Sequence, residues 1–198
     1  MDVVEYAIYR KLVGGSGGGD DELSELDRFI GEEGFDVINC YSTRVRNGAF
    51  YGAIVDTIIL HEARNLGTRY SFNSCTATKI VFKKQLTALS TSYVFSGLPN
   101  LKLVDVLLKQ NVGSDIFTNS KQFDTLILRS ENVNTLSSKY SFDGTLIESG
   151  AGHIYVPRAL VDSYKSSTNW STFASQFRAL EDYTVDGTIK GALDMSKI

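Results

Sequence analysis

Phenylalanine recurs along this chain at a nearly fixed interval, and each recurrence has the same apolar neighbours. Successive members of the series lie 22, 23, 22 and 25 residues apart. The series consists of Phe50, Phe72, Phe95, Phe117 and Phe142. An aliphatic residue precedes each of them by five or six positions, and a short alternating apolar run follows the first four. A fixed period of this length predicts a solenoid, in which each coil buries its apolar face only against its neighbours.

The alternating runs predict one short parallel strand in each coil. Neighbouring residues of a strand point to opposite faces, so one residue pair per run is expected to point into the core. These pairs are Ile38/Cys40, Ile58/Leu60, Ile80/Phe82, Val104/Val106 and Leu126/Leu128. The pattern therefore predicts an α/β solenoid of about five coils, closed by helices at both ends.

The residues between the core pairs form an outward ladder, which we take as the candidate binding face. Its members are Asn39, Ile59, Val81, Asp105, Ile127 and Tyr155. Such a row fits ordinary strand propensity on a half-exposed face, and it also fits a contact surface for a ligand or a second copy of the chain. A partly basic row beside it would suit an acidic or glycan ligand: His61, Lys83, Leu107 and Arg129.

A second aromatic series accompanies the phenylalanines. Tyr70, Tyr93 and Tyr140 each stand two positions before a member of the phenylalanine series. They predict an aromatic ladder on the outside or at the rim of the fold.

The chain opens with a segment that is separate from the repeats. Residues 1–13 are apolar along one helical face, so we expect Val4, Ile8 and Leu12 to form an attachment surface. Residues 14–19 read GGSGGG, a flexible linker without core-forming side chains. A helix this short is marginal alone in water, so the segment needs a partner surface.

The remaining sequence divides into a cap, the repeats, a second cap and a tail. Residues 20–34 predict a cap helix, with acidic residues at its start and glycines at its end. Residues 35–152 hold the coils, and residues 153–183 hold a last strand and a helical C-terminal cap. Within that cap, one helical stripe is formed by Trp170, Phe173, Phe177 and Leu180, and we expect Trp170 to pack on the last coil with Leu160 and Phe173 beside it. The polar, weakly patterned residues 184–198 predict an extended tail.

Composition limits the possible functions. The chain has 198 residues, of which 42% are hydrophobic, and a net charge of −3 without a basic stripe, which argues against nucleic acid. No apolar run approaches the roughly 18 residues of a membrane span, and residues 1–13 lack the pattern of a secretory signal. Cys40 and Cys75 are too few for a disulfide framework, and we expect both to be small buried hydrophobes.

The sequence offers little catalytic chemistry. His61 and His153 are separated by about four coils, so they cannot share a metal or a proton relay. The chain contains no HExxH, CxxC, GxSxG or P-loop pattern. We therefore expect no enzymatic activity, no cofactor and no metal site.

Several segments resemble BspA-like leucine-rich repeats. The resemblance rests on YSFNSCTATKIVF, YVFSGLPNLKLVDV and GAFYG within the coils, and on IYVPRALVDSYKSSTNWSTFASQFRALE, which resembles the C-terminal cap of such arrays. It covers roughly residues 36–181. The chain departs from the family's Ala-Phe pattern before four of the phenylalanines: Ser71, Val94, Ile116 and Ser141 stand there.

This resemblance implies a binding protein. Members of the family occur among bacterial surface and secreted adhesion proteins and among bacteriophage-encoded proteins. With the opening segment, it implies an anchor, a flexible arm and a binding head: a virion component that contacts a protein or glycan ligand on a surface. Residues 1–13 would bind another virion or scaffold protein, or a second copy of the chain. A bacterial cell-surface or extracellular adhesin and an intracellular scaffold are the alternatives.

Overall fold

A computed structural model of the chain describes residues 35–45, 48–66, 71–90, 92–185 and 188–189. The predicted attachment segment, linker and N-terminal cap helix, residues 1–34, lie outside the described residues. Tyr70 lies outside them as well.

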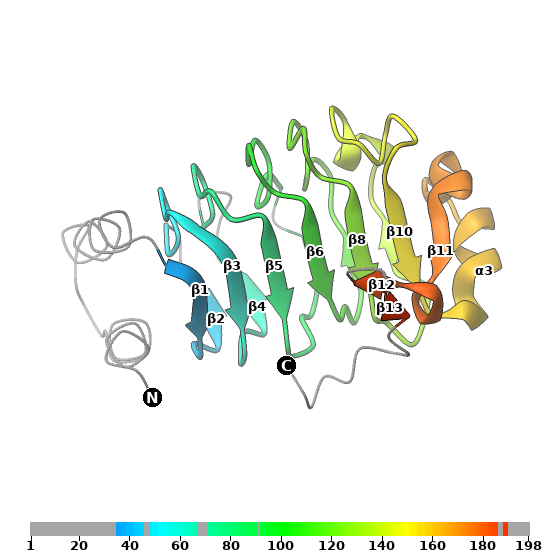
Figure 1. Ribbon diagram of the computed structural model, residues 1–198. Coiled ribbons are helices and arrows are strands. Elements are labelled where there is room, and N and C mark those ends of the chain that lie inside the picture. Colours follow the sequence, from blue (N-terminus) through cyan, green and yellow to red (C-terminus); the bar gives the residue numbers. More distant parts are fainter. Residues whose placement is uncertain (1–34, 46–47, 67–70, 91, 186–187, 190–198) are drawn as a thin grey trace.

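A seven-stranded parallel sheet forms one side of the molecule (Figure 1). Its strands, in spatial order, are β1 (Phe35–Cys40), β3 (Val55–Leu60), β5 (Lys79–Phe82), β6 (Leu103–Val106), β8 (Thr125–Leu128), β10 (His153–Val156) and β11 (Phe177–Ala179). Every neighbouring pair is parallel. The described chain is therefore α/β, with a mostly parallel sheet and few helices. None of its described helices is long and apolar enough to span a membrane.

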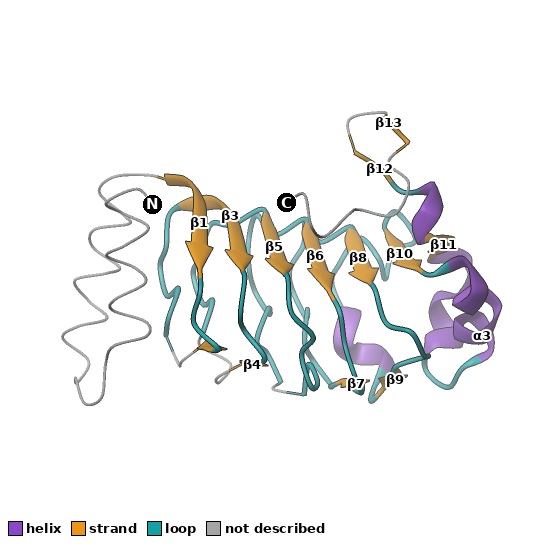
Figure 2. Ribbon diagram, turned by 90° about the horizontal axis from the view of Figure 1, so that it is seen from below, coloured by secondary structure: helices purple, strands orange, loops and turns teal. Residues whose placement is uncertain are grey.

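The segments that return between the strands lie behind the sheet (Figure 2). They contain two short parallel pairs, β2 (Arg44–Val45) with β4 (Asn65–Leu66) and β7 (Asn111–Val112) with β9 (Thr135–Leu136). Leu89 forms an isolated parallel bridge with Val112. The aliphatic residues that precede each phenylalanine in the sequence thus lie on the side opposite the main sheet.

The predicted core pairs of the strands are confirmed. All ten side chains are at most 1% exposed. The pairing register aligns Ile58 with Ile80, Ile80 with Val104, and Val104 with Leu126, so the inward residues of neighbouring strands lie side by side.

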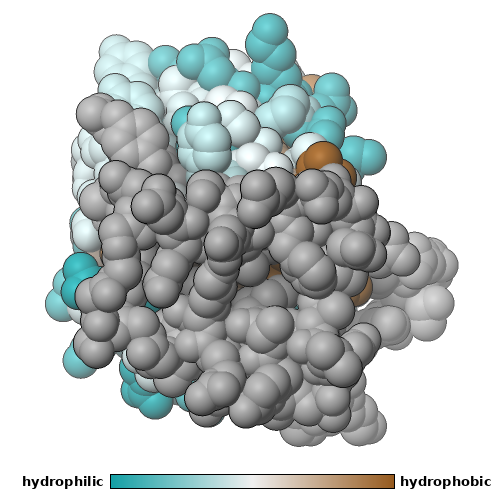
Figure 3. Space-filling model, turned by 90° about the vertical axis from the view of Figure 1, so that its left-hand side faces the viewer, coloured by the Kyte–Doolittle hydropathy of each residue, from teal (hydrophilic) through white to brown (hydrophobic). Residues whose placement is uncertain are grey.

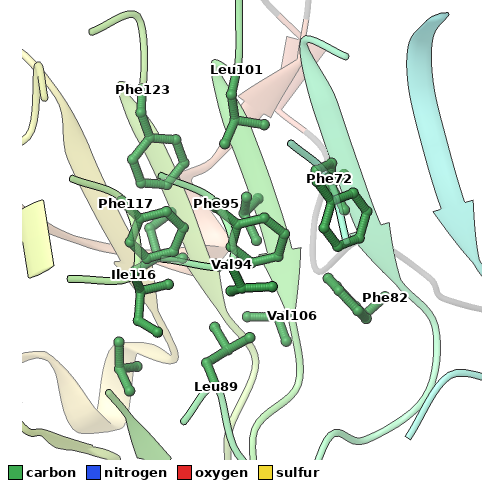
Figure 4. Close-up of a cluster of buried hydrophobic side chains, with 14 of the residues drawn as sticks. Phe72, Phe82, Leu89, Val94, Phe95, Leu101, Val106, Ile116, Phe117 and Phe123 are labelled. Atoms are coloured by element: carbon green, nitrogen blue, oxygen red, sulfur yellow. The ribbon is translucent and has the colours of Figure 1, made fainter. Parts of the chain in front are cut away.

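The five phenylalanines form one buried row between the sheet and the return segments. Consecutive ring centroids lie 5.2, 5.1, 5.6 and 5.4 Å apart from Phe50 to Phe142. Two further rings join the row (Figure 4): Phe82 meets Phe95 edge-on at 6.3 Å, and Phe123 stacks on Phe117 at 4.3 Å. Phe95 is fully buried, as its place in the pattern predicts.

The chain turns sharply after each phenylalanine. The residue two positions later has a positive φ in all five cases: Gly52 (67°), Ser74 (58°), Gly97 (67°), Asn119 (63°) and Gly144 (73°). Glycine and asparagine tolerate this left-handed conformation best. The turns also bond to each other, because the backbone N–H of Gly97 donates to the carbonyl of Thr118 at 2.9 Å.

Buried hydroxyls complete the hydrogen bonding between adjacent segments. The hydroxyl of Ser120 donates to the carbonyl of Phe95 at 2.6 Å and accepts from the backbone N–H of Leu98 at 3.0 Å. Ser130 makes the same two contacts with the backbone of Leu108. These serines are buried without penalty because each satisfies a backbone group that would otherwise lack a partner.

The C-terminal cap covers the last phenylalanine. Its elements are η2 (Arg158–Leu160), α3 (Val161–Ser166), η3 (Trp170–Gln176) and η4 (Leu180–Asp182), and a separate short helix, η1 (Lys139–Phe142), ends on the phenylalanine itself. The Trp170 ring lies 6.0 Å from Phe142 and Phe173 lies 4.9 Å from it, which confirms the predicted packing. The Trp170 indole N–H donates to the carbonyl of Asn134 at 2.7 Å.

Two predictions for this end of the chain are wrong. The stripe from Trp170 to Leu180 is not one helix, because η3 kinks at Phe173 and the chain then extends into β11. β10 is therefore not the last strand of the sheet. Phe177 and Ala179 are buried while Arg178 is exposed, a period of two that suits a strand, and β11 supplies the backbone partners that β10 needs on its open side.

The predicted extended tail contains a short antiparallel pair. β12 (Thr184–Val185) pairs with β13 (Thr188–Ile189), two residues apart along the chain. The intervening Asp186-Gly187 is a sequence typical of tight hairpin turns.

Truncating a ring in the buried row is expected to destabilise the fold strongly. Phe95→Ala should lower the free energy of unfolding by about 3–5 kcal/mol, because it removes a fully buried ring and leaves a cavity. Urea unfolding followed by circular dichroism measures the change. Tyr51→Ala is the matched control, since Tyr51 is 48% exposed and should change stability by less than about 0.5 kcal/mol. Equal effects of the two variants would contradict the packing described above.

Because of the two buried cysteines, the free energy of unfolding should decrease as the pH rises above 9. Burial raises the pKa of the Cys40 and Cys75 thiols from 9.0 to about 11. Below pH 9 both states keep these protons. Between pH 9 and 11 the unfolded chain loses them while the folded chain retains them. Stability should therefore fall by about 1.4 kcal/mol per pH unit for each thiol. Unfolding free energies measured from pH 8 to 10.5 test this, and a Cys40→Ala/Cys75→Ala variant should show a shallower slope.

Candidate binding face

The structure aligns the six residues of the candidate binding face in one row. Each is paired with the next across adjacent strands, in the order Asn39, Ile59, Val81, Asp105, Ile127 and Tyr155. Arg178 of β11 extends the row by one position. The register that the sequence predicts for the outward side is therefore the one that the strands adopt. The candidate attachment residues Val4, Ile8 and Leu12 lie outside the described residues.

Exposure differs along this row. Asn39, Ile59 and Tyr155 are partly exposed, whereas Val81, Asp105 and Ile127 are almost fully buried. The expectation of a half-exposed surface is therefore wrong for the centre of the row. An outward position on a strand does not ensure exposure, because residues that follow in the chain can fold over the sheet.

Tyr183 covers the C-terminal end of the face, and the β12–β13 hairpin follows it in the chain. The Tyr183 ring lies edge-on to Tyr155, with centroids 4.7 Å apart. Both figures place the hairpin over β8 and β10 on the outward side of the sheet (Figures 1 and 2). Arg158 anchors the chain just before this crossing, because its backbone N–H donates to the carboxylate of Glu181 and its guanidinium pairs with Asp182. Burial raises the pKa values of Tyr155 and Tyr183.

A buried ion pair lies at the centre of the face. Arg129 donates from Nε and Nη2 to the two carboxylate oxygens of Asp105, each at 2.7 Å. The two side chains are 9% and 3% exposed. This two-bond geometry satisfies both oxygens of a carboxylate that strand burial would otherwise leave unpaired.

Lys83 lies beside this pair without a partner of its own. Its ammonium nitrogen is buried and makes no hydrogen bond. Burial lowers the pKa of Lys83, the charge of Asp105 opposes that shift, and the charge of Arg129 adds to it. The centre of the face therefore places two basic side chains beside a single carboxylate.

The N-terminal end of the face is open and mixed in character. Val37 of β1 is 47% exposed, and Ile59 is partly exposed nearby on β3. The His61 ring stacks on Tyr41 at 4.4 Å, and its Nε2 is 2.8 Å from Asn39 Oδ1. In the view from the β1 end, the described residues that are visible beside the grey atoms are mainly hydrophilic, with isolated hydrophobic residues (Figure 3). This open end combines apolar side chains with hydrogen-bonding groups, as protein-binding surfaces do.

The two histidines occupy different ends of the sheet. His61 directly follows β3, whereas His153 begins β10 and meets Tyr155 edge-on at 6.1 Å. Within the described ranges, no three His, Cys, Asp or Glu side chains gather in a way that could hold a metal ion. The absence of catalysis and of cofactors stays a prediction.

Sequence reasoning missed the ion pair and the covering tyrosine. The signal for the pair was Asp105 itself, since aspartate is depleted in strands and here replaces an aliphatic residue of the row. Arg129 directly follows β8, two residues after Ile127, which is the strand partner of Asp105. The sequence holds no comparable signal for Tyr183, because its contact depends on how the chain leaves the cap.

Comparison of the sequence with models of known protein families and with curated proteins found no match.

Removing the carboxylate from the centre of the face should be costly. Asp105→Asn leaves Arg129 and Lys83 buried without a negative charge, so we expect a loss of about 3 kcal/mol of unfolding free energy. Glu62→Gln is the control, because its pair with Lys84 is 3.7 Å long and exposed, and should contribute less than about 1 kcal/mol. Urea unfolding at pH 7 measures both variants, and a small effect of Asp105→Asn would mean that the pair is not desolvated.

Proposed function

We propose that this protein is a non-enzymatic binding protein built as a leucine-rich solenoid of the BspA-like type. Three features support the solenoid: the single buried row of phenylalanines, the recurring positive φ two residues after each of them, and the seven parallel strands in one register. One phenylalanine of the row and one such positive φ follow each of the first five strands of the sheet. A fold of this kind presents an extended sheet face to a partner.

The observation that carries the binding function is the open N-terminal end of the outward face. Val37 and Ile59 expose apolar surface there, next to the polar groups of Asn39 and His61. The other end is closed by Tyr183, and Val81 of β5 is buried, so a partner would approach over β1 and β3. We propose that the ligand is a protein or glycan on a surface.

We propose further that the protein is a bacteriophage virion component, displayed on the particle and attached through residues 1–13. The support is the resemblance to family members encoded by phages, together with the apolar stripe and glycine linker that precede residue 20. Genes for capsid, tail and baseplate proteins beside this gene would favour the proposal. Sortase or secretion genes would favour a bacterial surface adhesin instead.

Charge placed on the open end of the face should abolish binding. We expect Val37→Glu/Ile59→Glu to lose binding to an array of surface glycans and extracellular proteins that retains the unmodified chain. The reason is that a carboxylate would have to be desolvated in the contact. Lys109→Glu is the control for added charge, because Lys109 is exposed and lies between β6 and β7, outside the outward face of the sheet. Retention of the double variant at full strength would refute this location of the binding surface.

A further inference from the structure

A second exposed feature lies outside the seven-stranded sheet, and the proposed function does not use it. Tyr93 and Tyr140 are 44% and 55% exposed, and each stands two residues before a buried phenylalanine. Asp115 occupies the same position before Phe117, and its carbonyl accepts the backbone N–H of Tyr93 at 3.1 Å. Tyr93, Asp115 and Tyr140 therefore share one sequence position, two residues before the phenylalanine, on three adjacent segments, and we call them the tyrosine ridge; Tyr93 and Asp115 are left-handed, whereas Tyr140 lies in η1.

Neither backbone preference nor core packing explains why a tyrosine stands at position 93. Its φ is +64°, a left-handed conformation that is unfavourable for a bulky side chain. The equivalent position before Phe50 is Gly48, which adopts φ 71° without strain. The Tyr93 ring is also largely exposed, so it adds little to the core. Strain held at an exposed aromatic residue is typical of a binding site.

The spacing between residues of the tyrosine ridge matches the spacing between sugar rings in an extended polysaccharide. Two strand spacings separate Tyr93 from Tyr140, about 10 Å, and the buried rings beside them advance by 5.6 and 5.4 Å. One step of the ridge is thus close to the length of one pyranose unit in an extended polysaccharide. Lys139 lies 5.4 Å from the centroid of the Tyr140 ring and covers one of its faces, and the exposed remainder of the ring is available to a ligand.

The polar groups on the ridge select the kind of ligand. The carboxylate of Asp115 stands between the two tyrosines and can accept hydrogen bonds from hydroxyl groups. Partial burial and the nearby carboxylates of Glu148 and Asp115 raise the pKa of Asp143, whereas the charge of Lys139 lowers it. A sugar acid or sulfated glycan would bring its negative charge next to the Asp115 carboxylate, which disfavours it. A proline-rich peptide could stack on the rings, but proline has no N–H to donate to Asp115.

We propose that the tyrosine ridge binds a neutral, extended oligosaccharide. Two of its sugar rings stack on Tyr93 and Tyr140, and the hydroxyl groups of the sugar between them donate to the Asp115 carboxylate. Tyrosine suits this role because it offers a large rigid surface that loses little conformational freedom on binding.

Isothermal titration of the full chain tests the proposal. The probes are neutral hexasaccharides of β-1,4-linked glucose, xylose, mannose and N-acetylglucosamine, with a polygalacturonate hexasaccharide and a polyproline peptide for comparison. We expect one or more of the neutral probes to bind, and Tyr93→Ala or Tyr140→Ala to weaken that binding about tenfold. Tyr51→Ala, at a similarly exposed tyrosine outside the ridge, should leave it unchanged.

Tyr93→Gly gives a readout that a purely structural role would not. Glycine relieves the left-handed strain, so this variant should raise the melting temperature while losing oligosaccharide binding. The Val37→Glu/Ile59→Glu variant of the sheet face should bind the oligosaccharide normally, which separates this site from the one under Proposed function. Absence of binding to all four neutral probes, tighter binding of polygalacturonate or polyproline, or unchanged binding by Tyr93→Gly would overturn the proposal.

Discussion

The spacing between hydrogen-bonded strands and the spacing between stacked phenylalanine rings are nearly equal in this protein, and the rest of the structure depends on that match. Parallel strands lie about 4.8 Å apart, and the centroids of the stacked phenylalanines lie 5.1 to 5.6 Å apart. One phenylalanine per strand can therefore continue the aromatic row at the interval at which the sheet gains a strand. The hydrogen-bonded turns after each ring hold the same spacing on the other side of the row.

Because each segment is stabilised by its neighbours, the ends of the row need special treatment. At the C-terminal end, Trp170 and Phe173 cover Phe142, while β11 pairs with the open edge of β10. The Tyr164 hydroxyl adds a polar closure, since it accepts the backbone N–H of Asn134 at 3.0 Å and donates to its side-chain oxygen. The cap therefore satisfies both requirements of an exposed last segment, the burial of apolar surface and the pairing of backbone groups.

Because the buried side chains hold the parallel strands in one register, the outward positions are free to carry different chemistry on each strand. Along the outward row, the same structural position holds an amide, aliphatic groups, a carboxylate and a phenol. Asp105 is accepted there because Arg129 neutralises it with two bonds. The tyrosine ridge uses the same freedom on the return side, where one position holds Gly48, Tyr93 or Asp115. Both proposed binding surfaces thus depend on a core that does not change when an outward side chain does.

The sequence by itself determined which residues face the core and how the strands align. The phenylalanine period and the alternation within each run were enough, because burial of apolar groups is the main driving force of folding and its periodicity is written directly in the chain. It also indicated that Trp170 packs on the last coil and covers the C-terminal end of the core. Only the tertiary structure decided that Phe177 belongs to a seventh strand, since a stripe that fits a helix also fits a strand when an unpaired sheet edge lies next to it. The burial of Val81, Asp105 and Ile127 and the crossing of Tyr183 over Tyr155 were likewise decided by contacts between residues distant in the chain, which local patterning does not encode.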